Sequence, residues 1–165
     1  MKNKTFFYYL GLLIIILLIQ GTRFDFWSIY GVKPDLVLLF IFVISLREGS
    51  IPGTVFGFIG GLIQDLFSNG LLGSGAFSKS LWGYLVGKSN LRLDTNSPVV
   101  QFGLLFCISM GDGLLIHLLD WMLRHHGSFG GRVAYYVVWQ AVYNCCVWPI
   151  FSYVLARIDK RLGIA

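Results

Sequence analysis

Glycine recurs at every fourth position in one stretch of this chain, and this spacing limits how the stretch can fold. Gly53, Gly57 and Gly61 are followed at the same interval by Asp65. Helical residues advance by about 100° each, so these four residues share one face of a helix with Gly60. Large apolar side chains fill the opposite face. The small face therefore predicts close approach of a second helix, and the large face suits lipid.

A second stripe with the same spacing follows a break at residues 68–70, and it consists of Gly75, Lys79, Gly83 and Gly87. Two helices with small faces, each carrying one ionisable residue, predict a tight hairpin inside a helical bundle. Two interpretations stay open, a packing face without chemistry, which we favour, and a ligand site. The residues assigned to helix packing or a partner interface are Gly53, Gly57, Gly60, Gly61, Asp65, Gly83 and Gly87.

The composition places the chain in a membrane. Of the 165 residues, 56% are hydrophobic and 13% are charged, whereas a soluble domain carries about 25% charged residues. A membrane-spanning helix needs roughly 20 residues, so six spans use most of the chain and leave no segment for a soluble domain. We expect an all-α integral membrane protein with one domain, residues 1–165, and six transmembrane helices in one bundle. The predicted helices cover residues 5–20, 34–46, 51–67, 71–87, 98–123 and 133–156.

The distribution of Lys and Arg predicts the orientation, because cytoplasmic loops of membrane proteins are enriched in both. With the N-terminus inside, eight of the 13 basic residues are cytoplasmic, namely Lys2, Lys4, Arg47, Lys88, Arg92, Arg157, Lys160 and Arg161. Both termini are therefore predicted to be cytoplasmic. The net charge of +5 follows from the same rule and from attraction to anionic lipid, so it does not call for nucleic acid as a partner.

Several polar residues fall inside the predicted spans, and they are the candidate functional residues. An ionisable group in hydrocarbon costs several kcal/mol when it is alone, so such groups are usually paired or hydrated. An Asp65–Lys79 pair is possible across the hairpin, either as a structural lock, which we favour, or as part of a substrate site. The intramembrane polar residues are Asp65, Lys79, Asp112, His117, Asp120, Gln140 and Asn144.

Other chemistries find less support in the sequence. A metal site built from His117, Asp120, His125 and His126 matches no strong ligand spacing, and the three cysteines lie in apolar runs, so we expect no metal and no cofactor. A proton relay through Asp112 and His117 is conceivable, but helix locking is the simpler role. No nucleophile–base arrangement or nucleotide-binding loop is present in the sequence, so an enzyme is not expected.

Three segments of the chain resemble the family of the bacterial rod shape-determining protein MreD. Residues 33–39 (KPDLVLL) resemble the start of its second helix, and residues 53–66 with Leu72-Gly73 resemble its central hairpin. Residues 147–149 (VWP) before a basic C-terminus resemble its last helix. The resemblance covers most of the chain, with the first thirty residues matched by hydropathy alone. Lys79 is not part of the pattern.

The resemblance implies a multi-pass protein of the bacterial cytoplasmic (inner) membrane without enzymatic activity. Its expected role is that of a scaffold subunit of the rod complex, or elongasome, which binds MreC and supports peptidoglycan synthesis. The wider complex would include RodA, a class B penicillin-binding protein and MreB. The six-helix layout is also similar to the substrate-binding subunits of energy-coupling-factor transporters. The alternative function is therefore a small-molecule-binding subunit of a vitamin transporter of that type.

Overall fold

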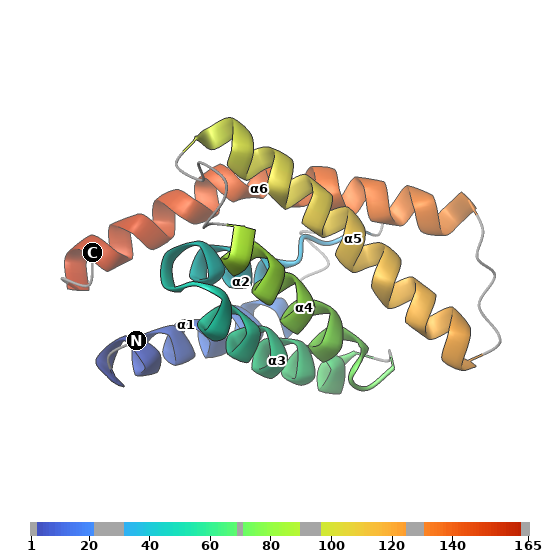
Figure 1. The fold of residues 1–165 in the computed structure, drawn as a ribbon, viewed down its shortest axis with the longest axis horizontal. Helices are drawn as coiled ribbons and strands as arrows, with labels where there is room; N and C mark the ends of the chain where they lie inside the picture. The colour runs from blue at the N-terminus through green and yellow to red at the C-terminus, as the bar shows by residue number, and fades with distance from the viewer. Residues whose placement is uncertain (1–2, 22–31, 69–70, 90–96, 125–130, 163–165) are drawn as a thin grey trace.

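The computed structural model describes residues 3–21, 32–68, 71–89, 97–124 and 131–162. Within these ranges the chain is all-helical, and the expectation of six helices is confirmed (Figure 1). The helices are α1 (Asn3–Gly21), α2 (Leu36–Glu48), α3 (Ser50–Phe67), α4 (Ser74–Ser89), α5 (Pro98–Arg124) and α6 (Gly131–Leu162). The ends shift by a few residues from the expected ones, most at α6, which continues past residue 156.

Only some of these helices have the length and hydropathy of a membrane span. Among the described residues three do, and α1 adds a shorter apolar helix, so the candidate spans number three to four where six were predicted. The other two are α2, with 13 residues, and α4, with 16 residues, both below the roughly 20 residues of a full crossing. The three long spans are Ser50–Phe67, Pro98–Leu123 and Val133–Asp159.

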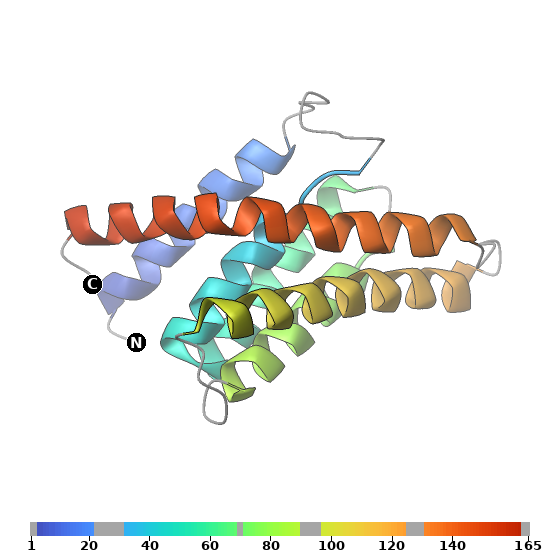
Figure 2. The same ribbon diagram turned by 90° about the horizontal axis from the view of Figure 1, so that it is seen from above.

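The short helix α2 forms the centre of the bundle. Nine consecutive residues, 37–45, are buried, and α2 contacts each of the other five helices. A helix that is apolar on all sides favours complete burial, and the sequence LVLLFIFVISL has no polar face. Figure 2 shows α2 behind α6 and between α1 and α5. Because protein surrounds this helix, its length is not set by the thickness of the lipid.

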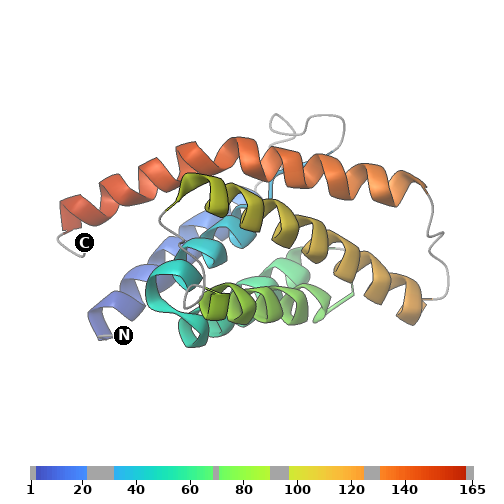
Figure 3. The same cartoon turned by 45° about the horizontal axis from the view of Figure 1, so that its top comes forward.

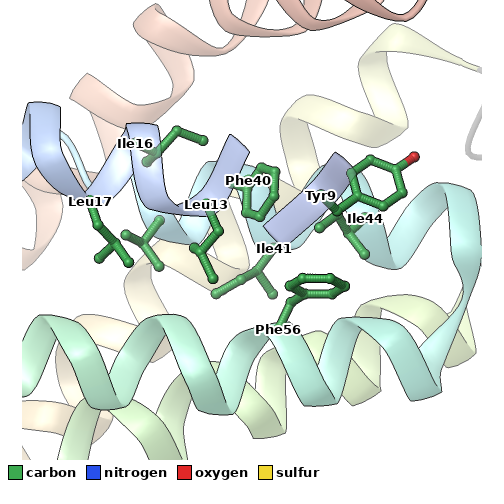
Figure 4. Packing of buried hydrophobic residues seen from close by; sticks show 9 residues of the cluster. Tyr9, Leu13, Ile16, Leu17, Phe40, Ile41, Ile44 and Phe56 are labelled. Carbon is green, nitrogen blue, oxygen red and sulfur yellow. The ribbon is translucent and has the colours of Figure 1, made fainter. Parts of the chain in front are cut away.

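Two apolar clusters surround α2. The first joins α1, α2 and α3, and its aromatic centre is Phe40 of α2, whose ring lies edge-on to that of Phe56 at 6.3 Å between centroids (Figure 4). The second joins α2 to α4, α5 and α6, where the rings of Phe42 and Trp148 lie 4.9 Å apart. Side chains on different faces of one helix thus connect the two halves of the bundle.

The glycine stripe of α3 packs against α4. A Cβ atom added at Gly57 would lie 2.5 Å from the carbonyl oxygen of Lys79, and one added at Gly61 would lie 2.5 Å from that of Gly75. Both distances are shorter than the approach that real Cβ atoms make, so only glycine fits. Gly60 does not face α4, because a Cβ atom added there would meet Val37 of α2 and Leu13 of α1. The partner of the stripe is therefore a helix of the same chain.

The two ends of the bundle differ. Both termini lie at one end, together with the connection between α2 and α3 (Figure 1). At the other end, the last turns of α5 and the first turns of α6 extend past the remaining helices (Figure 3). These turns carry exposed aromatic side chains, among them Trp121 and Trp139, which are each 48% exposed. Such residues are typical of the interface between membrane and water.

We predict that Gly57→Leu or Gly61→Leu separates α3 from α4 and yields an aggregated protein. Packing is the main attraction between helices in lipid, so no hydrophobic drive would hold the two helices together once a large side chain pushed them apart. Phe58→Leu is the matched control, because Phe58 lies on the opposite face and is 53% exposed. Size-exclusion chromatography in mild detergent measures the outcome. A monodisperse Gly61→Leu protein would contradict the tight packing of this hairpin.

Candidate functional site

Lys79 of α4 lies at the centre of a buried ionic cluster. Its residue exposure is 1%, and its Nζ atom lies 2.9 Å from Oδ2 of Asp35 and 3.5 Å from Oδ2 of Asp112. The three side chains come from three segments: the start of α2, the middle of α4 and the middle of α5. Two carboxylates therefore share one ammonium group inside the bundle.

Asp35 reaches Lys79 because it caps α2. Its Oδ1 atom accepts a hydrogen bond from the backbone N–H of Leu38 at 3.0 Å, which satisfies one of the unpaired donors at the helix start. The expectation that Pro34 begins this helix is wrong, since α2 begins at Leu36 and Asp35 is the N-cap residue. The second carboxylate oxygen is left to bind the ammonium group of Lys79.

Neutral polar side chains extend the cluster to α6. Ser78 donates to Oδ1 of Asp112 at 2.6 Å, and the amide oxygen of Asn144 accepts the backbone N–H of Asp35 at 2.8 Å. The amide nitrogen of Asn144 donates to Oγ of Ser109 at 3.1 Å. We call this set the polar junction. It consists of Asp35, Ser78, Lys79, Ser109, Asp112 and Asn144, each at most 3% exposed.

The pair of Asp65 with Lys79, which the sequence left possible, is not formed, because Lys79 pairs with Asp35 and Asp112. The carboxylate of Asp65 instead accepts backbone N–H groups of Gly73 at 2.9 Å, Gly75 at 3.0 Å and Ala76 at 3.2 Å. These donors belong to the first turn of α4 and the residue before it, where helical N–H groups lack intrahelical partners and an anion is favoured. Asp65 thus closes the α3–α4 hairpin. The side chain of Lys79 points away from α3, toward α2 and α5.

Only one of the remaining candidate residues belongs to the junction. Asn144 belongs to the junction, but His117, Asp120 and Gln140 are only partly buried. The described residues contain no group of three or more His, Cys, Asp or Glu side chains that could hold a metal ion. His125 and His126, which entered the metal hypothesis, lie outside the described residues. No proton path between Asp112 and His117 appears among the described contacts.

A second ionic network lies near the chain termini, and sequence reasoning missed it. Asp159 of α6 is 3% exposed, accepts a hydrogen bond from the Tyr8 hydroxyl at 2.7 Å and pairs with Arg47. It joins α6 to α1 and to the end of α2. The sequence analysis assigned Arg47 and the basic C-terminus to cytoplasmic segments. The signal that could have indicated this network is Asp159, an acidic residue between Arg157 and Lys160.

The geometry supports assembly rather than catalysis. Within the described residues, the buried charges of the polar junction face one another, and the serine hydroxyls are engaged with a carboxylate or an amide. In a low-dielectric interior such contacts are strong, and a charge without its partner would be costly. The arrangement holds α2, α4, α5 and α6 in one register.

The comparison with protein families agrees with this picture. The family model for rod shape-determining protein MreD matches residues 2–158. The chain belongs to the MreD family. Its role is therefore in rod-shape determination as a non-enzymatic membrane protein, and Asp35, Lys79 and Asp112 all lie within the matched range. No curated protein and no solved structure matches the chain.

We predict that Lys79→Met lowers the free energy of unfolding of this MreD-family protein by about 3–5 kcal/mol, the cost of leaving a buried ion pair without one partner. Thermal unfolding in detergent measures the loss. Lys88→Met is the matched control, because Lys88 lies in the last turn of the same helix and is exposed. A triple variant with Lys79→Met, Asp35→Asn and Asp112→Asn removes every charge and should recover much of the stability. Equal stability of Lys79→Met and wild type would contradict this role.

Proposed function

We propose that this MreD-family protein is a scaffold subunit of the rod complex in the bacterial cytoplasmic membrane. It binds MreC and supports lateral peptidoglycan synthesis by RodA and a class B penicillin-binding protein, in concert with MreB. One observation carries the proposal beyond family membership: the side chains of the polar junction bind one another and are at most 3% exposed. The outer helix faces are apolar, which suits contact with lipid and with other membrane helices.

The vitamin-carrier alternative finds less support in the described residues. A carrier needs polar side chains that converge on an open pocket. The groove between α3 and α4 is instead lined mainly by apolar and small side chains, such as Val55, Phe58, Leu62, Ala76 and Phe77. The observation that still agrees with the carrier alternative is the number of helices, which is six.

We also propose that both termini are cytoplasmic and that all six helices cross the membrane. The count of Lys and Arg supports this orientation, and the two termini lie at the same end of the bundle (Figure 1). The short α2 can cross because protein covers residues 37–45. In α4 the glycine-rich face lies against α3, and only part of the helix surface meets lipid.

One preparation tests the scaffold proposal and the orientation. A protein tagged after Arg161 should recover MreC and RodA in mild detergent, as identified by mass spectrometry. In intact spheroplasts, the tag should resist added protease until the membrane is permeabilised. Recovery of an ATPase pair with a coupling subunit, and not MreC, would favour the carrier. A tag cleaved in intact spheroplasts would reverse the orientation.

A further inference from the structure

The polar junction has an odd number of ionisable groups. Asp35 and Asp112 contribute two negative charges when both are ionised, and Lys79 contributes one positive charge, so the formal sum is −1. All three residues are at most 3% exposed. An uncompensated charge in such an environment is expensive, and a buried acid that cannot be paired binds a proton instead. One carboxylate in the junction is therefore surplus.

The geometry distinguishes the two carboxylates. Asp35 lies 2.9 Å from Nζ of Lys79, accepts the N–H of Leu38 and sits at the positive end of the α2 dipole. Asp112 lies in the middle of α5, where backbone N–H groups are engaged in the helix, and its distance to Nζ is 3.5 Å. Charged hydrogen bonds are usually about 2.7–2.9 Å long, so only the contact with Asp35 has full strength.

The other described cations of the helices that pack against α5 lie near the helix ends and have contacts elsewhere. These helices are α2, α4 and α6. Arg47 pairs with Asp159, Lys88 lies over the ring of Tyr84, and Arg157 lies over the ring of Tyr153.

The charges that act on Asp112 are Lys79 from α4, which attracts, and Asp35 from α2, which repels. From α6 the junction receives Asn144, which is neutral. The hydroxyl of Ser78 satisfies Oδ1 of Asp112 but brings no charge.

We propose that Asp112 is a proton-binding site that holds one proton on Oδ2 in the folded protein. The neutral carboxyl group accepts the hydroxyl hydrogen of Ser78 at Oδ1 and leaves Asp35 and Lys79 as a balanced pair. Release of this proton restores the surplus negative charge inside the bundle and weakens the packing of α5 against α2 and α4. The packing of α5 at the junction thus depends on the pH of the solution with which Asp112 exchanges its proton.

The first test is infrared spectroscopy of the purified wild-type protein in detergent at neutral pH. The proposal expects the carbonyl-stretch band of a protonated carboxyl group, with an isotope shift in D₂O. The band should be absent in Asp112→Asn and kept in Asp120→Asn, a matched control two turns further along the same helix. If the wild type lacks the band, or if Asp112→Asn keeps it, the proposal is overturned.

The second test uses stability and holds even where one variant folds poorly. A native state that keeps a proton which the unfolded chain releases loses stability as pH rises. The thermal midpoint of the wild type should therefore fall with rising pH by more than that of Asp112→Asn. Each single variant, Asp112→Asn or Asp35→Asn, should keep a folded protein, with Asp112→Asn the milder, and the double variant should be far less stable. Equal pH slopes in wild type and Asp112→Asn, or additive losses in the double variant, would overturn the proposal.

Discussion

The register of α2, α4 and α5 depends on one buried ammonium group, that of Lys79. In lipid, apolar side chains do not prefer protein to their surroundings, so packing and polar contacts decide how helices assemble. Lys79 contacts carboxylates from α2 and α5, and Asn144 joins α6 to the cap of α2. Sliding α2, α4 or α5 along its axis would leave a buried charge without its partner, and sliding α6 would leave buried polar groups unpaired, so these contacts favour a single arrangement.

The glycine stripe and the polar junction are parts of one construction. Gly57 of α3 touches the backbone of Lys79, so the close approach of α3 fixes the position of α4 from one side. The Lys79 side chain leaves α4 on the other side and reaches α2 and α5. Asp65 then holds the start of α4 through the backbone N–H groups of Gly75 and Ala76 and of Gly73, the residue before the helix. Small residues set the distance between helices, and charges set their register.

Local patterns in the sequence predicted the six helices and the tight α3–α4 hairpin, because apolar runs and four-residue spacing are local properties. They did not predict the partners of Lys79. Asp35 looked like an ordinary residue at a helix start, and its second oxygen is engaged only after distant helices meet. The pairing with Asp65 was inferred from closeness along the hairpin, but the unpaired N–H groups of α4 lie nearer. The Asp159 network was not predicted either, because it joins residues that are far apart in the sequence, such as Tyr8 and Asp159.

The central claim is that Lys79 and Asp35 act as one unit in holding the bundle together. The most direct measurement is a double-mutant cycle on unfolding free energy in detergent, with Lys79→Met, Asp35→Asn and both together. The account predicts that the double variant loses less stability than the sum of the single losses, with a coupling of about 1 kcal/mol or more. Additive losses, within about 0.5 kcal/mol, would contradict the account.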